Sequence, residues 1–488
     1  MSAAEFPAYL AGRFVTTSQR KILHAPFDGA PFASVSLCGP AELDEALAAS
    51  AGAEGAAAAL PAHARSAICR AVADGLRARA SEIADGMVTE SGKPIGDAEA
   101  EVERAIHCFE LASAEAERIY GEVIPLDLRP ASTGRWGLTR RFPLGLVAGI
   151  APFNFPLNLA VHKIAPAMAA GCPIVLKPAT QTPTSCLRLA EIIDGTAWPK
   201  GALSIVPSSR EAADVLTTDE RPRLLSFTGS PQVGWAMKAR AGKKKVVLEL
   251  GGNAAVIIDE SADLDAALPK LVYGAFSYAG QKCISVQRIY VHARRWDEFR
   301  TRFVDAAKAV GIGDPRERQN LVGPMIDEAN ARRIEGWIAE AGAAGATVLC
   351  GGPRRGTVVP PTVLTGVPAT AKLACEEAFG PTVNLEPVAS FDAGLERVND
   401  SAFGLQCGVF TSDLGNTMRA FERLVVGAVI VNDAPSYRID HMPYGGVKDS
   451  GFGREGIRHA LRDMTEKRLL VLVPPTAGPP VAPQRGTG

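Results

Sequence analysis

Cys283 and Glu249 are the side chains whose types and surroundings best suit covalent chemistry. Cys283 follows a small turn with the sequence Tyr-Ala-Gly-Gln-Lys, which can expose a thiol and hold it close to a substrate. Glu249 ends an apolar run and precedes Leu-Gly-Gly-Asn. A positioned thiol can attack a substrate while a positioned carboxylate moves protons. Because a single cysteine is more often a small buried hydrophobe, other segments must decide between these two interpretations.

The length and charge of the chain limit its class. It has 488 residues, of which 47% are hydrophobic and 22% are charged, and its formal net charge is −1. These values predict a soluble globular protein with two or three domains. Because there is no basic excess, we expect neither nucleic acid nor an anionic membrane as a partner.

The nine cysteines are scattered along the chain, and no Cys-x-x-Cys sequence occurs. The seven histidines form no pair at ligand spacing, so we expect neither a disulfide framework nor a metal site. The first residues lack the basic and apolar segments of a signal peptide, and no apolar run reaches membrane-spanning length. We therefore expect a cytoplasmic protein whose Cys283 stays a free thiol.

The elements that must position these two residues follow an α/β pattern. Residues 41–120 have helical spacing, and two alternating runs within 122–144 predict a protruding β-hairpin. Short apolar runs then alternate with helical stretches, which is typical of a parallel sheet with crossover helices. These runs are 145–150, 174–177, 203–206, 224–227 and 246–250. A second α/β series begins at residue 254, and an isolated strand at 468–473 is expected to pair with the hairpin or with another subunit.

Two glycine-containing segments are candidates for binding a phosphate. Gly451–Gly456 matches G-x-G-x-x-G, but a loop precedes it instead of a strand, so we reject it as a dinucleotide fingerprint. The better candidate begins where a strand ends at Thr228, because Gly229 permits a turn and Ser230 can cap the next helix. The N–H groups of such a helix end can bind a pyrophosphate. Lys177, at the end of another strand, is well placed to bond a ribose or a phosphate.

Seven segments together resemble the aldehyde dehydrogenase superfamily, in its order and at its spacing, over residues 5–473. They are Pro152-Phe-Asn-Phe-Pro156, Lys177-Pro-Ala, Phe227-Thr-Gly-Ser230, Leu248-Glu-Leu-Gly-Gly-Asn253, Gly280-Gln-Lys-Cys283, Glu376-Glu-Ala-Phe-Gly-Pro381 and Pro443-Tyr-Gly-Gly-Val-Lys-Asp-Ser-Gly.

The resemblance implies an α/β fold with two domains and a small oligomerisation element. We expect a Rossmann-like NAD(P)-binding domain at 1–121 and 146–248 and a second α/β catalytic domain at 249–442. A small β element at 122–145 and 465–476 is expected to join subunits into a homodimer or homotetramer. Residues 477–488 are expected to form a flexible tail.

The resemblance also implies a covalent mechanism. Cys283 would attack an aldehyde carbonyl to form a thiohemiacetal, whose oxyanion the side-chain amide of Asn154 and the backbone N–H of Cys283 would hold. Hydride transfer to the nicotinamide would leave a thioester, which water activated by Glu249 would hydrolyse. Lys163 matches a lysine that the family places behind the active site as a proton relay, and a surface lysine is the alternative interpretation.

The cofactor implied by the resemblance is NAD or NADP. Glu377 would bond the nicotinamide-side ribose, with Phe379 nearby, and Lys177 would bond the adenosine ribose. Thr180 stands where NAD-preferring members commonly carry a glutamate, so NADP is admissible, with NAD slightly preferred and Arg210 as a nearby source of charge. The predicted cofactor-binding residues are Phe153, Lys177, Thr180, Gly229, Ser230, Val233, Glu377 and Phe379.

Polar and cationic residues converge on the expected substrate channel. Asn158 and His162 are four residues apart and therefore share a helix face. Lys282 precedes the nucleophile, where it can also lower the thiol pKa, and Arg104 lies on the helix that would cover the channel. We therefore expect a small aldehyde with a carboxylate, phosphonate, phosphate or sulfonate group, unless Lys282 and Arg104 point to solvent or pair with neighbouring glutamates. The predicted substrate residues are Arg104, His107, Asn158, His162, Lys282, Ile284, Arg438 and His441.

Two other functions stay open at the level of the sequence. A CoA-acylating dehydrogenase would release the thioester to CoA, but such relatives typically lack a glutamate where Glu249 stands. A non-catalytic structural protein on the same fold could lose Cys283, Asn154 or Glu249 without penalty, and all three are present.

Overall fold

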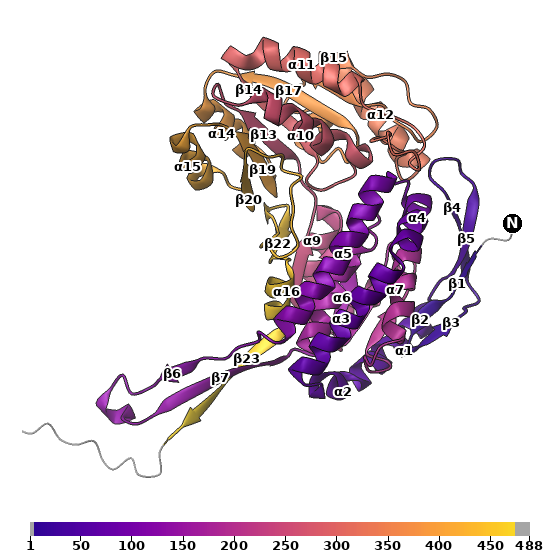
Figure 1. The fold of residues 1–488 in the computed structure, drawn as a ribbon, viewed down its shortest axis with the longest axis vertical. Coiled ribbons are helices and arrows are strands. Elements are labelled where there is room, and N and C mark those ends of the chain that lie inside the picture. The colour runs from indigo at the N-terminus through magenta and orange to yellow at the C-terminus, as the bar shows by residue number, and fades with distance from the viewer. Residues whose placement is uncertain (1–3, 474–488) are drawn as a thin grey trace, which may run out of the picture.

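The computed structural model describes residues 4–473. Figure 1 shows two parts, each built around a sheet, and a narrow arm that projects from one of them. The first sheet takes most of its strands from the chain before residue 250, and the second takes all of its strands from residues 254–431. The chain then returns to the first sheet, where residues 451–452 add a short strand at one edge.

The first sheet has eight strands in the order β22-β12-β11-β8-β9-β10-β2-β3. Their bounds, in that order, are Gly451–Phe452, Lys245–Glu249, Leu224–Thr228, Val147–Ile150, Ile174–Lys177, Leu203–Ile205, Ala8–Leu10 and Arg13–Val15. The strands from β12 to β10 are parallel, as the sequence predicts. The chain passes from β8 to β9 and β10 on one side, and then to β11 and β12 on the other. This is the strand order of Rossmann-like folds, which bind ligands at the carboxyl ends beside the reversal point.

Helix α6 (Asn158–Ala170) follows β8 and is buried along its whole length. It lies between the sheet and the helices α3 and α5, and five of its 13 residues are alanine, which allows close packing on both sides. Residues 41–120 form helices, as predicted. The helices of this part are α1 (Pro40–Gly52), α2 (Glu54–Ala59), α3 (Ala62–Ala78), α4 (Ala80–Ser91), α5 (Ile95–Ala116), α7 (Thr184–Asp194), α8 (Val215–Thr218), α9 (Pro231–Arg240) and α16 (Ile457–Asp463).

The second sheet has seven strands in the order β15-β16-β17-β14-β13-β19-β20. Their bounds, in that order, are Thr347–Cys350, Thr362–Thr365, Thr382–Val388, Val286–His292, Ala254–Ile258, Gln406–Phe410 and Ala428–Val431. All its pairs are parallel except β15 with β16. The interior strand β13 is entirely apolar and buried, which is typical of a parallel sheet covered on both faces. Its helices are α10 (Leu264–Phe276), α11 (Trp296–Lys308), α12 (Glu328–Ala343), α13 (Lys372–Cys375), α14 (Phe391–Asn399) and α15 (Leu414–Arg423).

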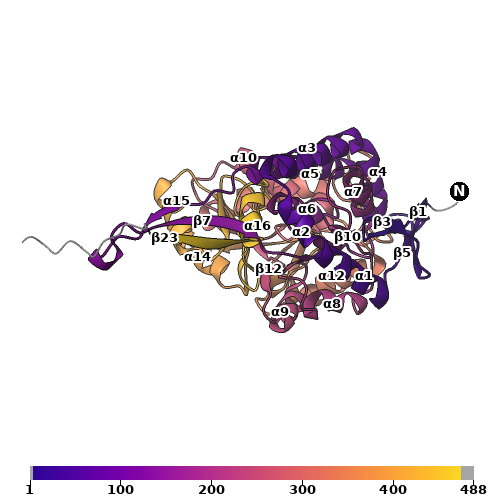
Figure 2. The same cartoon turned by 90° about the horizontal axis from the view of Figure 1, so that it is seen from below.

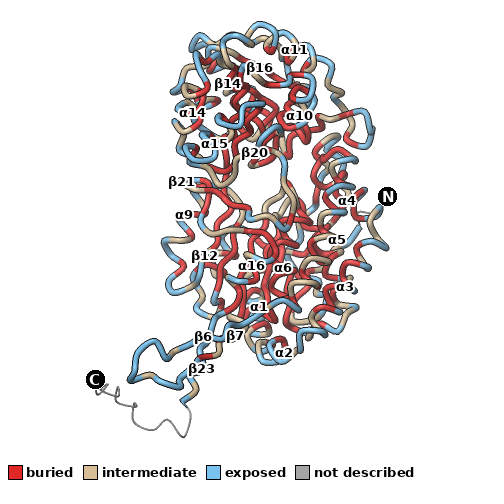
Figure 3. Tube along the Cα trace, turned by 60° about the vertical axis from the view of Figure 1, so that its left-hand side comes forward, coloured by how far each residue is buried: buried red, intermediate tan, exposed pale blue. Residues whose placement is uncertain are grey.

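The arm is a three-stranded sheet of β6 (Val123–Pro125), β7 (Trp136–Pro143) and β23 (Thr465–Leu472). Strand β23 pairs antiparallel with β7 along its whole length, and Figure 2 shows the two side by side. The final strand therefore pairs with the hairpin, which is one of the two predicted alternatives. The buried core lies within the two sheet-centred parts, while most of the arm is exposed (Figure 3). The predicted tail at 477–488 lies outside the described residues.

The remaining strands form two small sheets. These are β1 (Ala4–Phe6), β5 (Pro31–Ser36) and β4 (Arg20–His24), and the pair β18 (Phe403–Gly404) and β21 (Val447–Lys448). The rejected glycine motif begins at β22, a two-residue strand antiparallel to β12, and so lacks the parallel strand that the fingerprint requires. Within residues 4–473, no helix is long and apolar enough to cross a membrane.

Candidate active site

Cys283 follows a tight turn that precedes strand β14. Tyr278 and Ala279 have φ values of 54° and 53°, and Gly280 has a φ of 68°. A left-handed backbone at two non-glycine residues stores strain, which is typical of functional turns. A side chain at Gly280 would meet the carbonyl oxygen of Gly380 at 2.2 Å, so only glycine fits there. The turn leaves Cys283 half-buried, although most of its neighbours are fully buried.

The thiol of Cys283 has one hydrogen-bond partner among the described residues, the hydroxyl of Tyr444, at 3.0 Å. Burial raises the pKa of Cys283 to about 11, and the hydrogen bond from Tyr444 opposes that rise. Burial also lowers the pKa of Lys282 to about 8. Because a thiolate is the reactive form of a cysteine, the groups around Cys283 that stabilise negative charge decide its reactivity.

Glu249 stands at the carboxyl end of β12 and is buried. Neither of its carboxylate oxygens has a hydrogen-bond partner within residues 4–473. Burial and the negative charge of the nearby Glu455 raise the pKa of Glu249 well above its usual range. A buried carboxylate without partners has a strong tendency to take up a proton, so it can act as a general base toward a bound water.

Lys163 is completely buried in helix α6 and is not a surface lysine. Its ammonium group donates to the hydroxyl of Thr228 at 2.7 Å and to Oε1 of Glu455 at 3.0 Å. The carboxylate of Glu455 also accepts a hydrogen bond from Arg438 at 3.0 Å. Lys163, Glu455 and Glu249 therefore form one buried group of charges behind Cys283.

Asn154 lies in the loop after β8 and is buried. Its amide nitrogen donates to the backbone carbonyl of Gln281 at 3.0 Å, which ties the first sheet to the turn before Cys283. An amide NH₂ group has two protons, so the second proton can still bind an oxyanion at Cys283.

The predicted cofactor residues from the first part lie at the carboxyl ends of its parallel strands, beside the reversal point. Phe153 follows β8, Lys177 ends β9, and Gly229 and Ser230 follow β11. Ser230 occupies the cap position of α9, as predicted, but its side chain makes no capping hydrogen bond. Its hydroxyl and the N–H groups of that helix end can therefore serve a phosphate. Val233 is partly buried on the first turns of α9.

Lys177 is buried, and its ammonium group bonds only the carbonyl oxygen of Pro178, at 3.2 Å, within the described chain. Burial, together with the positive charges of Arg210 and Lys21, lowers its pKa to about 8. Thr180 is half-buried three residues further on. The ammonium group of Lys177 therefore has further hydrogen-bond donors for a ligand, which fits the ribose end of a dinucleotide.

Glu377 and Phe379 belong to the second part and contact residues near the predicted cofactor site, which are Gly252 and Phe153. The backbone N–H of Gly252 donates to Oε1 of Glu377 at 2.9 Å, and burial raises the pKa of Glu377 to about 7. The ring of Phe379 lies edge-on to that of Phe153, with 5.8 Å between their centres. The residues present therefore fit a dinucleotide that extends from Lys177 toward Cys283.

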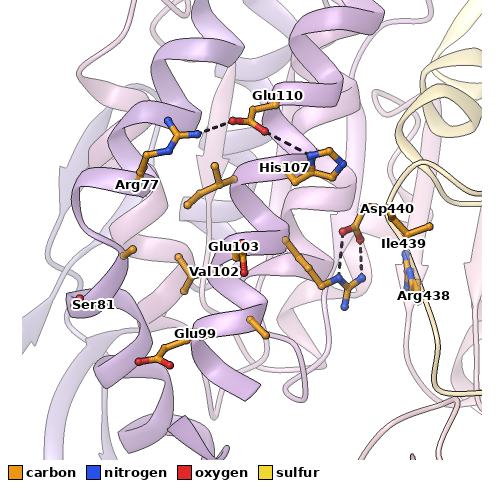
Figure 4. A pocket seen from close by; sticks show the side chains of 14 residues that line it. Arg77, Ser81, Glu99, Val102, Glu103, His107, Glu110, Arg438, Ile439 and Asp440 are labelled. Carbon is orange, nitrogen blue, oxygen red and sulfur yellow. Dashed lines mark hydrogen bonds and ion pairs between the residues drawn. The ribbon is translucent and has the colours of Figure 1, made fainter. Parts of the chain in front are cut away.

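One cavity, the inner cavity, lies beside the turn that carries Lys282, and a second, the outer cavity, shares two of its lining arginines. The inner cavity has a volume of about 170 Å³, and Lys282, Arg104 and Arg438 are among the residues that line it. The outer cavity has a volume of about 740 Å³ and lies between α5, α4 and the loop at 438–440. Arg104 and Arg438 line both cavities. In Figure 4, Glu110 and His107 lie on the side of α5, and Asp440 and Arg438 lie on the loop opposite.

The inner cavity is lined by four cations and two carboxylates, which are Lys93, Arg104, Lys282, Arg438, Asp97 and Glu101. The three predicted cations come from separate segments, as the sequence predicts, but their contacts differ. Arg104 donates to the two carboxylate oxygens of Asp440 at 2.6 and 3.1 Å. Arg438 pairs with Glu455. Lys282 contacts the hydroxyl of Ser277 and forms no ion pair within residues 4–473.

Asn158 and His162 share a helix face, as predicted, but both are buried beneath the cavities and line neither of them. His162 contacts Asp440 at 2.8 Å, and Asn158 donates to the same carboxylate at 3.4 Å. The ligand atoms of Cys108, His162 and Asp440 lie within 4.8 Å of one another, as in a metal site. The guanidinium groups of Arg104 and Arg438 bond this cluster and would oppose a metal cation.

The other predicted substrate residues lie in different places. His107 lines the outer cavity, with its Nδ1 3.5 Å from Glu110. His441 is exposed and lines neither cavity. Ile284 is buried against Leu405 and Tyr444, beside Cys283.

Sequence reasoning missed Tyr444, Asp440 and Glu455 as site residues. Tyr444 contacts Cys283, and Asp440 and Glu455 hold the arginines of the cavity. The segment Pro443-Tyr-Gly-Gly signalled the neighbourhood of Tyr444. Glu455 lies inside the rejected glycine motif, so that motif has a role unrelated to phosphate.

Comparison with known proteins agrees with this fold. The aldehyde dehydrogenase family model matches residues 14–470. The 3-sulfolactaldehyde dehydrogenase of Priestia megaterium is 39% identical over 469 residues, which are 96% of this chain and 98% of that protein. The structure of aldehyde dehydrogenase 21 from Physcomitrella patens, in complex with the reaction product succinate, is 45% identical with a TM-score of 0.95 and covers 97% of this chain and 99% of its own.

A second solved structure is glyceraldehyde-3-phosphate dehydrogenase from Methanocaldococcus jannaschii complexed with NADP. It is 34% identical, has a TM-score of 0.90, and covers 93% of this chain and all of its own. The chain described here belongs to the aldehyde dehydrogenase family. It is therefore an NAD(P)-dependent oxidoreductase that acts on aldehydes.

Proposed function

We propose that this enzyme oxidises a small aldehyde carrying an anionic group to the corresponding carboxylic acid, with Cys283 as its nucleophile. The observation that carries the proposal is the convergence of Lys282, Arg104 and Arg438 on the inner cavity. These cations come from the turn before Cys283, from α5 and from the loop at 438–440.

The charge of the inner cavity supports an anionic ligand. Its lining holds four cations against two carboxylates, Asp97 and Glu101, and Glu101 pairs with the fourth cation, Lys93. The carboxylates that pair with Arg104 and Arg438 lie outside this lining. The ammonium group of Lys282 is buried without an ion pair in the described part of the chain. A buried cation is costly unless it is paired, so an anionic substrate group would supply the counter-charge.

The similar proteins support the same class of substrate. The name of the Priestia enzyme specifies an aldehyde with a sulfonate, the moss structure holds the dicarboxylate succinate, and the archaeal enzyme is named for a phosphorylated aldehyde. The shared property is a small aldehyde with an anion at its far end, and the three anions differ.

The residues at Cys283 have complementary tasks in this reaction. The sulfur of Cys283 forms a bond to the aldehyde carbon, and the carbonyl oxygen takes the negative charge beside the amide of Asn154. Lys177, the end of α9 and Glu377 would hold NAD or NADP, which would supply the acceptor for the hydride that leaves the thiohemiacetal carbon and so leaves a thioester on Cys283. Glu249 then removes a proton from a water whose oxygen attacks the thioester carbon and releases the sulfur.

A matched pair of aldehydes tests the substrate class. We expect the wild type to have a higher kcat/KM for a four-carbon aldehyde with a terminal carboxylate than for butanal. Arg104→Ala should reduce that preference by about tenfold, because an ion pair in a partly buried site contributes on the order of 1.4 kcal/mol. The control is Arg318→Ala, which removes an exposed arginine paired with Glu99. Equal preference in wild type and Arg104→Ala would contradict the proposal.

A further inference from the structure

Within residues 4–473, the hydroxyl of Tyr444 is the hydrogen-bond partner of the proposed nucleophile's sulfur. Tyr444 is 2% exposed, and its Oη lies 3.0 Å from Sγ of Cys283. No other hydrogen bond of this hydroxyl is found within residues 4–473. The phenol is therefore aimed at the sulfur and at nothing else in the described chain.

The ring of Tyr444 is fixed in place by a cation from the substrate cavity. The guanidinium carbon of Arg438 lies 3.7 Å from the ring centre. Arg438 is in turn held by Glu455 at 3.0 Å and lies 3.3 Å from Nε2 of His162. A stacked guanidinium that has its own ion pair gives the ring little freedom to move. The hydroxyl therefore has a defined position relative to Cys283.

The chemistry of the pair decides the direction of the hydrogen bond. A phenol remains protonated at neutral pH, and burial raises the pKa of Tyr444 further above its usual range. A thiolate has no proton to donate, so in the reactive form of Cys283 the tyrosine must be the donor. A hydrogen bond to a charged partner is stronger than one to a neutral partner, so it favours the thiolate over the thiol.

We propose that Tyr444 is a catalytic residue that stabilises the Cys283 thiolate by donating its hydroxyl proton in a hydrogen bond, with Arg438 as the residue that positions its ring. The inference rests on the proposed function only in taking Cys283 as the nucleophile. It also gives the cavity cation Arg438 a second task, since the same guanidinium faces the inner cavity and the ring of Tyr444.

Alkylation of the enzyme by iodoacetamide tests the proposal without any substrate. The thiolate displaces iodide, so the rate at Cys283 follows the thiolate fraction, and peptide mass spectrometry identifies the alkylated cysteine. In Tyr444→Phe we expect the rate at neutral pH to fall about tenfold or more and the rate profile between pH 6 and 11 to move up by about one pH unit. The control Tyr437→Phe removes a half-exposed hydroxyl in the preceding loop and should leave the profile unchanged.

The outcomes separate a chemical role from a structural one. An identical profile in wild type and Tyr444→Phe would overturn the proposal. A slower rate in Tyr444→Phe without a change in the thiolate absorbance at about 240 nm, measured against pH as the difference from Cys283→Ser, would also overturn it, because that result indicates lost access instead of a changed thiolate fraction. Alkylation of another cysteine, with Cys283 unmodified, would instead contradict the assignment of the nucleophile and with it the proposed function.

Discussion

The ammonium nitrogen of Lys282 lies 5.0 Å from the centre of the Tyr273 ring, so this cation is stacked on an aromatic face at the wall of the inner cavity. Its other contact is the neutral hydroxyl of Ser277. Neither contact neutralises the charge. Burial lowers the pKa of Lys282, and the carboxylate of Asp97, which also lines the cavity, opposes that fall but forms no ion pair with Lys282 within residues 4–473. Lys282, which precedes Cys283 in the chain, can therefore still take an anionic partner.

The pH dependence of substrate binding follows from Lys282. Burial lowers the pKa of Lys282 to about 8, so the side chain is cationic below pH 8 and neutral above it. We expect KM for an anionic aldehyde to rise about tenfold between pH 7 and pH 9, because about a tenth of Lys282 stays charged at pH 9. KM for butanal should stay level over the same range. In Lys282→Met the rise should disappear, and a rise that persists in this variant would assign the effect to another group.

The two cysteines nearest the site should behave differently. Cys283→Ser should lose nearly all activity, because the hydroxyl is a far weaker nucleophile than the thiol. Cys108 is fully buried against Asn158 and His162, and burial raises its pKa well above its usual value. Cys108→Ser should therefore keep most of the activity. Steady-state rates and iodoacetamide mapping of both variants check this, and an active Cys283→Ser enzyme would remove Cys283 from the mechanism.

Removal of the Glu249 carboxylate should separate the two halves of the reaction. In Glu249→Gln we expect kcat to fall by about 100-fold or more, since general base catalysis contributes about that much. Thioester should then accumulate on Cys283, visible as a burst of one NAD(P)H per active site and as an acyl adduct in the intact mass. Because the pKa of Glu249 is raised, thioester hydrolysis in the wild type should slow as the pH falls and the carboxylate is protonated.

Added CoA distinguishes hydrolysis from the CoA-acylating alternative. The wild type should give the same product with and without CoA, because a water activated by Glu249 releases the acid. Formation of acyl-CoA at a rate comparable with kcat would establish the alternative activity.

Cofactor choice should depend on Arg210. Thr180 carries no negative charge, and the charges of Arg210 and Lys21 are close enough to lower the pKa of Lys177. A 2′-phosphate would meet attraction there instead of repulsion. We expect NADP to be used, and Arg210→Ala to raise KM for NADP by about tenfold with a much smaller change for NAD. Equal changes for the two cofactors would place Arg210 outside the ribose site.

The buried pair of Lys93 and Glu101 should be important for stability. Both side chains are completely buried, and Glu101 also accepts hydrogen bonds from the backbone N–H groups of Leu157 and Asn158, each at 2.9 Å. Glu101→Ala should lower the free energy of unfolding by about 3–5 kcal/mol, because it leaves a buried ammonium group uncompensated. The exposed pair of Arg13 and Glu45 is the control: Glu45→Ala should cost less than about 1 kcal/mol in denaturant unfolding.

Much of the fold was predictable because its strands are local apolar runs. The strands at 174–177 and 224–228 are short, apolar and separated by helical stretches. Their positions can therefore be predicted without knowledge of contacts between distant segments. The turn before Cys283 was predictable for a similar reason, since Gly280 and the small residues near it are adjacent in sequence. Family motifs also placed Asn154 and Glu249, although the sequence alone does not show that Glu249 lacks hydrogen-bond partners.

The contacts that tune the site depend on the tertiary structure. Tyr444 and Cys283 are 161 residues apart, and Arg104 and Asp440 are 336 residues apart. The sequence by itself determined the positions of most strands and helices and the presence of cations near Cys283, because each follows from residue type and local pattern, and its family motifs predicted Cys283 as nucleophile and Glu249 as base. Only the folded chain decided that Lys282 is left without an ion pair while Arg104 has one. Burial and pairing are properties of the space between segments, and no local pattern encodes them.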